Sequence, residues 1–240
     1  MFSAAACHTV SDDCENVISS RPKALAQRAS NRQSVFVTDR ADHWDGVYSR
    51  AHAGTLSWYE REPTQSLRMI ERTGSGPSSA VLDVGAGTSI LVDRLLDLGF
   101  TDVTVLDISE RAIGEVRRRL GERADSATFI RHDVLTWQPA RRYDVWHDRA
   151  VFHFLTESTD RDRYVHLAED VVRTNGWLVL ATFAADGPTR CSDLPVCRYS
   201  AEDIRNTFSV AFGLVESDRE EHVTPRGVVQ PFTWVRLRHT

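Results

Sequence analysis

Four acidic or polar clusters, each at the end of an apolar run, carry the residues of this chain that could do chemistry. The first is the segment 83–87, which reads Asp-Val-Gly-Ala-Gly and precedes apolar residues at helical spacing. This pattern predicts a strand, a tight turn and a helix start. Glycine lets a ligand approach the backbone closely, and N–H groups at a helix start attract polar ligand atoms. A cofactor that contains a nucleoside is therefore the first hypothesis.

The glycine turn does not match the common phosphate-binding loops. Ile90 stands where the dinucleotide pattern has its third glycine, and the chain contains no Gly-Lys-Ser or Gly-Lys-Thr segment. Taken alone, the turn has a purely structural alternative, because a strand, a turn and a helix follow one another in many α/β domains. The clusters that come later in the chain favour the functional interpretation.

The second cluster is Asp107, which ends the apolar run 103–106. It lies about 20 residues past the glycines, the spacing at which a carboxylate meets a ribose diol. An ionised carboxylate offers two acceptor oxygens to the two ribose hydroxyls. The alternative is that Asp107 caps a helix predicted over 109–120, although Ser109 is suited to that role.

The third and fourth clusters follow the apolar runs 127–130 and 143–146. Asp133 could accept a hydrogen bond from an adenine amino group while Val134 packs on the ring, and a solvated loop acid is the alternative. The fourth run ends in His147, Asp148 and Arg149. Ligands of open parallel sheets bind beyond the carboxyl ends of the strands. Four polar strand ends in order therefore predict one shared site.

Together these motifs resemble the class I (seven-strand) S-adenosylmethionine-dependent methyltransferases, from about residue 42 to the C-terminus. The resemblance implies an α/β fold, a Rossmann-like three-layer sandwich with a mostly parallel seven-stranded sheet. Two late strands, expected over 208–217 and 229–238, form an antiparallel hairpin in this family, with the last strand inserted between its neighbours. The resemblance also implies S-adenosyl-L-methionine as cofactor and S-adenosyl-L-homocysteine as product.

The resemblance assigns a part of the cofactor to each cluster. The residues carried over are, in chain order, Asp83, Gly85, Ala86 and Gly87 for the methionine part, Asp107 and Ile108 for the ribose, Asp133 and Val134 for the adenine, and His147, Asp148 and Arg149 near the methyl group. Ser89 departs from the family pattern, because many members have a third glycine there.

An aromatic group precedes the first strand, where the family places a cover over the cofactor. We expect Trp58 and Tyr59, which precede Glu60, to face the cleft, because a sulfonium is attracted to a ring face. Trp44 and Tyr48 are instead expected on the buried face of one helix, with the cleft as the alternative.

Methyl transfer from a sulfonium needs little help from an acid, because the leaving group is neutral. Catalysis then depends on holding the nucleophile in line with the methyl group, and a base matters only if the acceptor arrives protonated. His147 and His153 are the candidate bases, although His153 has a structural alternative and His147 could orient a loop. Arg149 could bind an anionic substrate or pair with Asp148.

The fifth strand is predicted over 177–183. The resemblance implies that the loop after it, residues 187–199, shapes the acceptor pocket. The candidate substrate residues are Arg149, His153, Arg198 and Tyr199. Cys191 and Cys197, six positions apart, admit a metalloid or thiol acceptor, and the alternative is two loop cysteines. The four cysteines of the chain show no zinc spacing, so no metal is expected.

Composition and order suggest one domain after an extension. Residues 1–40 show little apolar periodicity and are expected to be flexible or loosely docked. The resemblance implies that residues 41–240 form the methyltransferase domain, with a helical cap or cleft cover (41–79), a cofactor-binding core (80–183), and an acceptor-pocket loop with the C-terminal hairpin (184–240).

The charge and hydropathy patterns exclude several kinds of partner. The net charge of −5 gives no general attraction to nucleic acid. No apolar stretch approaches the roughly 18 residues of a membrane span, and the N-terminus does not resemble a signal peptide. A cytoplasmic protein is expected, and the sequence leaves its oligomeric state open.

The function predicted from these residues is methyl transfer to a small-molecule nucleophile. A protein (lysine) methyltransferase is the alternative. The acidic-x-x-aromatic signature of that class maps onto 148–151, where the aromatic residue is absent and Phe152 is one position further on. A metalloid or thiol methyltransferase and a non-catalytic cofactor-binding subunit are less favoured.

Overall fold

The structure is a computed structural model that describes the backbone of residues 29–240 and the side chains from Arg40 onward. Helix α1 spans Ala29–Arg50, so it runs through the boundary that the sequence placed at residue 40. The rest of the expected extension, residues 1–28, lies outside the described residues.

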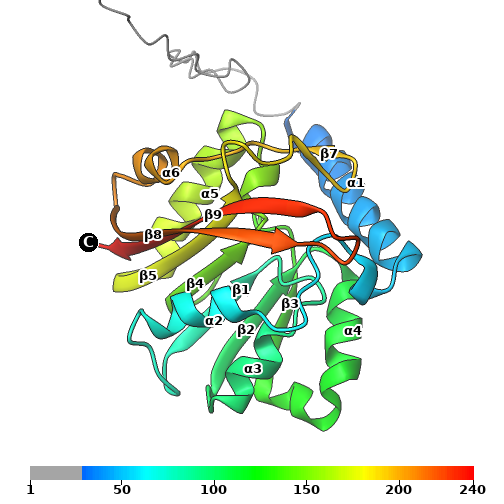
Figure 1. Ribbon diagram of the computed structural model, residues 1–240, viewed down its shortest axis with the longest axis horizontal. Coiled ribbons are helices and arrows are strands. Elements are labelled where there is room, and N and C mark those ends of the chain that lie inside the picture. The colour runs from blue at the N-terminus through cyan, green and yellow to red at the C-terminus, as the bar shows by residue number, and fades with distance from the viewer. Residues whose placement is uncertain (1–28) are drawn as a thin grey trace, which may run out of the picture.

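A seven-stranded sheet forms the centre of the molecule, in the order β3-β2-β1-β4-β5-β9-β8 (Figure 1). Five strands run parallel to one another. β9 is antiparallel to both β5 and β8 and lies between them. The fold class predicted from the sequence is confirmed, including the inserted last strand. The strand bounds are β1 Ala80–Val84, β2 Asp102–Asp107, β3 Ala127–Arg131, β4 Tyr143–Arg149, β5 Val172–Phe183, β8 Phe212–Val223 and β9 Val229–His239.

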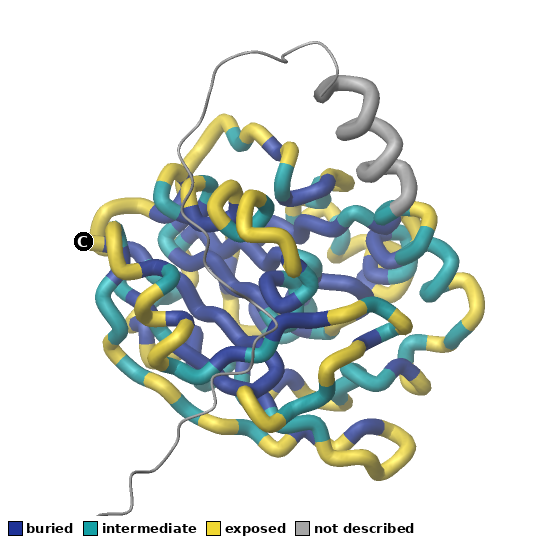
Figure 2. The backbone as a smooth tube through the Cα atoms, turned by 90° about the horizontal axis from the view of Figure 1, so that it is seen from above, coloured by how far each residue is buried: buried dark blue, intermediate teal, exposed yellow. Residues whose placement is uncertain are grey.

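Helices cover both faces of the sheet and complete three layers. Apolar side chains of α2, α3 and α4 pack on one face, and those of α5 and α6 pack on the other. The central strands are buried on both faces, as parallel strands between helices must be, and Figure 2 shows this buried centre within an exposed rim. The helix bounds are α2 Thr64–Glu71, α3 Leu91–Asp97, α4 Glu110–Leu120, α5 Ser158–Val171 and α6 Ala201–Thr207.

Short elements complete the chain. Three 3-10 helices span Ala53–Thr55 (η1), Gly121–Ser126 (η2) and Phe152–Phe154 (η3). β6 (Arg190–Cys191) and β7 (Leu194–Pro195) form a two-stranded sheet in the loop after β5. No helix of the described part of the chain is long and apolar enough to cross a membrane.

Two element boundaries differ from the sequence expectation. An Asn-Gly pair commonly ends a helix, but α5 ends at Val171, before Asn175-Gly176, and β5 begins at the next residue. Asn175 has a φ of +63°, and the pairing of β4 with β5 shifts register between Tyr143/Val172 and Val145/Trp177. The Asn-Gly pair therefore marks an irregularity within the strand and not a helix end. The strand expected over 208–217 lies at 212–223.

The strand order reverses beside β1, because β2 continues the sheet on one side and β4 on the other. Ligands of open α/β sheets bind outside the carboxyl ends of the strands at such a point. Helix α1 reaches this edge, where Asp45 accepts hydrogen bonds from the Ser109 hydroxyl and the Arg111 N–H at the start of α4.

Candidate cofactor and acceptor site

Two cavities meet at the carboxyl ends of β1, β2 and β4. The larger has a volume of about 320 Å³ and the smaller of about 50 Å³. Both are lined by Trp58, Val84, Gly85 and Arg149, so they adjoin one another. The larger cavity holds the expected ribose and adenine residues Asp107, Ile108, Asp133 and Val134, and the smaller holds Asp83, Ala86, His147 and Tyr59.

The glycine turn after β1 needs glycine at two positions. Gly85 has a φ of +61° and Gly87 a φ of +55°, which L side chains rarely adopt. A Cβ on Gly85 would lie 2.0 Å from Cγ2 of Val151, and a Cβ on Gly87 would lie 2.4 Å from the Tyr48 hydroxyl oxygen. The turn therefore lies close against the segment after β4 and against α1.

The backbone N–H groups of this turn do not face a ligand, which corrects the sequence expectation. The N–H groups of Gly85 and Ala86 donate to the carbonyl oxygen of Leu106, at 2.7 and 3.2 Å. The Gly87 N–H donates to Oδ2 of Asp107 at 2.7 Å. These bonds tie the turn to the end of β2, because buried N–H groups must find acceptors. The glycines of the turn therefore let a ligand come close to the backbone, but the N–H groups of the turn are not available to it as hydrogen-bond donors.

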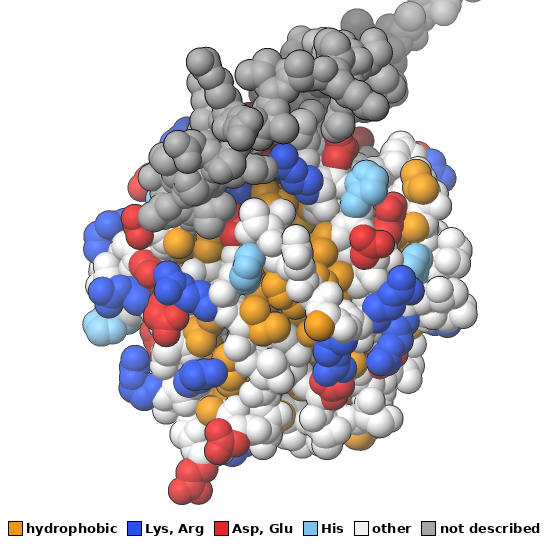
Figure 3. Space-filling view, turned by 180° about the vertical axis from the view of Figure 1, so that it is seen from behind, with side chains coloured by type: hydrophobic (Ala, Val, Ile, Leu, Met, Phe, Trp, Pro, Cys, Tyr) orange, Lys and Arg blue, Asp and Glu red, His pale blue; other side chains and the backbone are white. Residues whose placement is uncertain are grey.

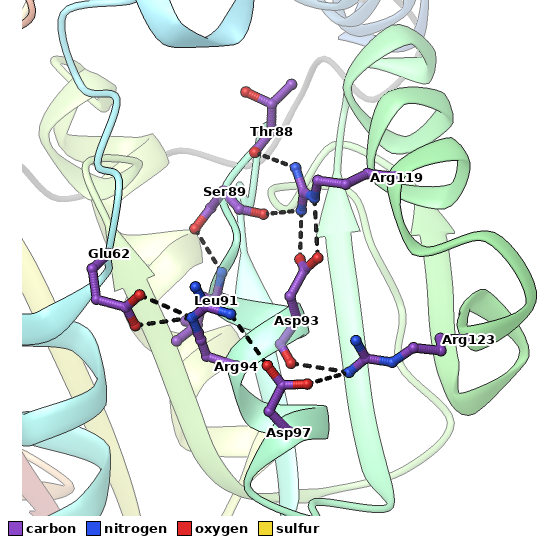
Figure 4. A network of polar contacts seen from close by, with 9 residues as sticks. All are labelled: Glu62, Thr88, Ser89, Leu91, Asp93, Arg94, Asp97, Arg119 and Arg123. Atoms are coloured by element: carbon purple, nitrogen blue, oxygen red, sulfur yellow. Dashed lines mark hydrogen bonds and ion pairs between the residues drawn. The ribbon is translucent and has the colours of Figure 1, made fainter.

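An arginine on α4 holds the residues that follow the turn (Figure 4). Arg119 donates from Nη1 to the carbonyl oxygen of Thr88 at 2.8 Å and from Nη2 to that of Ser89 at 2.6 Å. It also pairs with Asp93 of α3. Ser89, which replaces the family glycine, accepts the N–H of Leu91 on its hydroxyl at 3.1 Å. The departure from the family pattern thus gives the start of α3 a side-chain acceptor.

Asp107 lies at the end of β2 and lines the larger cavity. Its Oδ1 accepts the Ser109 N–H and its Oδ2 accepts the Gly87 N–H, both at 2.7 Å. Burial raises the pKa of this carboxyl to about 6, and the two backbone hydrogen bonds oppose that shift. Ser109, not Asp107, caps α4, since it accepts the Ala112 N–H. A carboxylate has about four lone-pair sites, so two remain for ribose hydroxyls.

Two further carboxylates each keep one buried oxygen without a hydrogen-bond partner in the described chain. Asp133 uses Oδ1 to accept the Leu135 N–H at 2.9 Å and leaves Oδ2 unbonded, 3.6 Å from Nη1 of Arg40. Asp83 uses Oδ1 for His147 and leaves Oδ2 unbonded. One lies in each cavity. Such orphaned oxygens fit the adenine amino group and the methionine ammonium of the expected cofactor.

His147 is held by two hydrogen bonds and lines the smaller cavity but not the larger one. Nδ1 lies 2.8 Å from Oδ1 of Asp83, and Nε2 lies 3.0 Å from Oγ of Ser66 on α2. All three side chains are buried. The chain Asp83–His147–Ser66 therefore joins β1, β4 and α2. Nothing in the sequence pattern links Ser66 to the motifs.

His153 lines the larger cavity but is unsuited to the predicted role of base. The ring is fully buried, and its Nδ1 accepts the N–H of Phe183 at 3.3 Å. Burial, with a smaller contribution from the charge of Arg149, lowers its pKa to about 3. The neutral ring therefore carries its proton on Nε2, which has no hydrogen-bond partner among the residues described. His153 is a hydrogen-bond donor.

Arg149 stands where the two cavities meet. Its Nη1 donates to the carbonyl oxygen of Trp58 at 3.1 Å, its Nε lies 3.4 Å from Oε2 of Glu60, and its Cζ lies 4.8 Å from the centre of the Phe232 ring. It does not pair with Asp148, which was one of the two expectations for it.

Asp148 lies outside both cavities, against the expectation that it borders the cofactor. This fully buried carboxylate accepts hydrogen bonds from the Tyr164 hydroxyl and from the N–H groups of Val151 and Phe152. Burial raises its pKa to about 6. Asp148 therefore fixes the segment that packs against Gly85, and it acts on the site through that segment.

An aromatic group forms one wall of the larger cavity. Trp44 lies 5.9 Å from Trp58 and 5.1 Å from Phe154 between ring centres, and Tyr48 lies 6.2 Å from Trp58. Trp44 and Tyr48 line the cavity, so their expected place on a buried helix face is wrong. The physical reason is that α1 lies over the strand ends, where its aromatic face meets the cavity. Trp58 borders both cavities and Tyr59 the smaller one.

The loop after β5 contributes to the cavity, but with other residues than the candidates. Cys191, Leu194 and Pro195 line it, whereas Arg198 and Tyr199 do not. Arg198 donates to the Gly187 carbonyl oxygen at 3.4 Å, and the Tyr199 ring lies 5.3 Å from that of Phe152.

The two loop cysteines have different surroundings. Cys191 lines the larger cavity, and burial raises the pKa of its thiol to about 11. Cys197 is not among the lining residues and lies in the core on the other face of the sheet, with Nη1 of Arg161 3.9 Å from its sulfur. A pair of thiolates directed at one metalloid is not formed here.

The sequence analysis did not predict one cluster of polar side chains beside the cavities. Glu60, Glu220 and His222 place one ligand atom each within 4.8 Å of one another, although they come from distant segments. Glu220 accepts the Trp234 indole N–H, and Nε2 of His222 lies 2.7 Å from the Ser57 carbonyl oxygen. Burial raises the pKa of Glu60 to about 7. A cation of the chain already lies beside this group, because Nε of Arg149 is 3.4 Å from Oε2 of Glu60.

The comparisons agree with this geometry. Residues 81–176 match the model of the methyltransferase domain family. This domain and the fold are those of class I S-adenosylmethionine-dependent methyltransferases, as the sequence predicted. The matched segment begins in β1 and ends in β5, so it contains all four strand-end clusters.

Relatives of this methyltransferase include enzymes with different acceptors. It is 22% identical to EEF1A lysine methyltransferase 2 of Homo sapiens over 73% of this chain and 75% of that protein. It is 26% identical to malonyl-[acyl-carrier protein] O-methyltransferase 2 of Ilyobacter polytropus over 44% of this chain and 40% of that protein. The match to the eEF1A lysine and N-terminal methyltransferase of Mus musculus, at 29% identity, covers 39% of this chain and 13% of that protein.

The fold also matches solved methyltransferase structures. One is the 1,6-didemethyltoxoflavin-N1-methyltransferase of Burkholderia thailandensis, with a TM-score of 0.61, 20% identity and 93% of each chain covered. That structure holds 1,6-didemethyltoxoflavin and S-adenosylhomocysteine. The likeness establishes the fold of this methyltransferase.

Proposed function

We propose that this protein transfers the methyl group of S-adenosyl-L-methionine to a small-molecule acceptor. The observation that carries the proposal is the composition of the two adjoining cavities, which have one unbonded carboxylate oxygen each and an aromatic wall in the larger. When bound, the cofactor supplies an electrophilic methyl group on a positively charged sulfur.

The chain's own residues would hold the cofactor along the strand ends. Asp83 would accept from the methionine ammonium, Asp107 from the ribose hydroxyls and Asp133 from the adenine amino group, while Ile108 and Val134 would pack on the rings. Asp83 and Asp133 have the free oxygens for this role, and Asp107 has free lone pairs. The cofactor-binding core of 80–183 and the cover of 41–79 follow from the same assignment.

The acceptor would lie against the aromatic wall and the loop after β5. Trp44, Trp58 and Phe154 exclude water there, which helps to hold a nucleophile in line with the methyl group. His153 is unsuited to take a proton from the acceptor, because it keeps its own proton on Nε2. His147 lines the smaller cavity and not the larger one. An acceptor that arrives already deprotonated suits this site.

A lysine-modifying function is the second candidate, because EEF1A lysine methyltransferase 2 resembles most of the chain. The cavity favours it less, since Arg149 borders the place where a lysine ammonium would enter. The position of the family's acidic-x-x-aromatic signature is occupied by the buried Asp148 and by Val151, which packs against Gly85. Nucleic acid is a poor acceptor for this surface, because basic and acidic side chains alternate on the face in Figure 3.

The proposal is tested by an experiment that traces the transferred methyl group. The protein is incubated with S-adenosyl-L-methionine labelled in its methyl group and with cell extract, which is then separated into protein and small-molecule fractions. We expect label in the small-molecule fraction. Label confined to protein, and released as methyl-lysine on hydrolysis, would replace the proposal by the second candidate.

A further inference from the structure

Two side chains that line the larger cavity keep N–H groups without a hydrogen-bond partner among residues 40–240. One is the guanidinium of Arg149, whose side chain is 9% exposed. Its Nη1 donates to the Trp58 carbonyl oxygen, while Nε and Nη2 have no hydrogen-bond partner. The other is Nε2 of His153, in a ring that is fully buried. A buried N–H without an acceptor is costly, so both donors favour a ligand that brings acceptor oxygens.

A row of rings connects the two donors. The His153 ring centre lies 4.7 Å from that of Phe183, the Phe183 ring 5.0 Å from Phe232, and the Phe232 ring 4.8 Å from Cζ of Arg149. All four residues line the same cavity. The charge of Arg149 also contributes to the lowered pKa of His153, so its field reaches that ring. The two donors therefore line one cavity and are joined by a continuous aromatic surface, against which the apolar body of a ligand could lie.

The charge of Arg149 is only partly balanced within the chain. Glu60 is the carboxylate that pairs with it, at 3.4 Å. Burial raises the pKa of Glu60 to about 7, and its hydrogen bond to Glu220 acts in the same direction. Glu60 is therefore partly protonated at neutral pH, and a buried guanidinium with a partly protonated partner attracts an external anion.

We propose that the acceptor molecule is a small anion with an apolar body, whose oxyanion is held by the N–H groups of Arg149 and His153. The apolar body lies against the aromatic wall of Trp44, Trp58 and Phe154. This inference rests on the proposed function, because it names the class of acceptor for that site. It also agrees with the role of His153 as a donor, since an anionic acceptor needs no base to remove a proton.

Calorimetric titration tests the inference without measuring turnover. The protein is first saturated with S-adenosyl-L-homocysteine, and this titration tests the proposed function by itself. Acetate, benzoate and 3-phenylpropanoate are then titrated, each against the amide of the same shape. We expect at least one carboxylate to bind about tenfold or more tightly than its amide, as charge-assisted hydrogen bonds require.

Three variants locate the preference. Arg149→Gln should remove the preference for the carboxylate, and His153→Phe, which keeps the packing and loses the N–H, should weaken it severalfold. Arg198→Gln is the matched control, because Arg198 lies outside the cavity, and it should keep the preference. His153→Phe decides the matter if Arg149→Gln does not fold, as circular dichroism would show.

The outcomes separate the two claims. If the wild-type protein does not bind S-adenosyl-L-homocysteine, the proposed function fails and the inference fails with it. If S-adenosyl-L-homocysteine binds but no carboxylate binds better than its amide, the inference alone is overturned. The same holds if the preference survives in both Arg149→Gln and His153→Phe.

Discussion

Replacing Gly85 by alanine should destabilise the protein in two separable ways. The residue has a φ of +61°, and an added Cβ would lie 2.0 Å from Cγ2 of Val151. An L residue in the left-handed region costs about 1–2 kcal/mol. Overpacking by one methyl group costs a further 1–3 kcal/mol or so, because carbon atoms normally approach no closer than about 3.5 Å. The free energy of unfolding should fall by about 2–5 kcal/mol.

Two companion variants divide that loss. Gly227 has a φ of +77° and open space where a Cβ would stand, so Gly227→Ala should show the backbone cost alone. Val151→Ala, combined with Gly85→Ala, removes the clashing methyl group and should restore about 1–3 kcal/mol.

Thermal and denaturant unfolding measure these terms. A loss of 2–5 kcal/mol corresponds to a fall in Tm of about 4–20 °C for a chain of this size. The reasoning is refuted if Gly85→Ala is no less stable than Gly227→Ala. It is also refuted if the Gly85→Ala, Val151→Ala double variant loses as much free energy of unfolding as its two single variants lose in sum.

Three further predictions follow from individual side chains. Asp83→Asn should weaken S-adenosyl-L-methionine binding about tenfold and leave 5′-methylthioadenosine binding unchanged, since only the former carries the ammonium; equal losses in calorimetry would contradict this. Glu60 has a pKa of about 7 in the folded protein against an ordinary value of 4.5. The folded state therefore holds this proton up to a higher pH than the unfolded state. The contribution of the protonated Glu60 to stability is complete below pH 4.5 and is lost as the pH rises to 7. Glu60→Gln should therefore match wild type at pH 4.5 and exceed it at pH 8 by at most about 3 kcal/mol, and a difference that does not change with pH would count against the assignment. Cys191→Ser and Cys197→Ser should each keep methyl transfer to the small-molecule fraction, and loss of transfer in both, with S-adenosyl-L-homocysteine binding intact, would revive the metalloid acceptor.

The sequence predicted those parts of the site that depend on local order. Strand ends can be recognised from apolar runs, and parallel strands bring their carboxyl ends together, so Asp83, Asp107 and Asp133 were predicted to lie in one site. The inserted β9 was predicted from the family resemblance and not from a pattern in the residues.

The rest depends on contacts between distant segments, which no spacing rule shows. Ser66 meets His147 only because α2 packs on the sheet, and Glu60 meets Glu220 only because β8 runs beside the cover segment. The proton on Nε2 of His153 is fixed by one backbone N–H, that of Phe183. These contacts make His153 a hydrogen-bond donor and not the predicted base, and they hold His147 between Asp83 and Ser66.

The positions of Trp44 and Tyr48 show a related limit. Their spacing indicates a helix with an aromatic face, but it does not indicate what that face covers. Because α1 lies over the strand ends, both side chains border the cavity, and the Tyr48 hydroxyl closes the space beside Gly87.

The most direct test of the account is a calorimetric titration of S-adenosyl-L-homocysteine into wild type and two aspartate variants. Asp107 and Asp102 stand at opposite ends of β2, and Asp102 pairs with Arg141 on the surface. The account predicts one site per chain in wild type and in Asp102→Ala, and no measurable binding in a folded Asp107→Ala. Absence of binding to the wild-type protein, or equal binding in both variants, would contradict it.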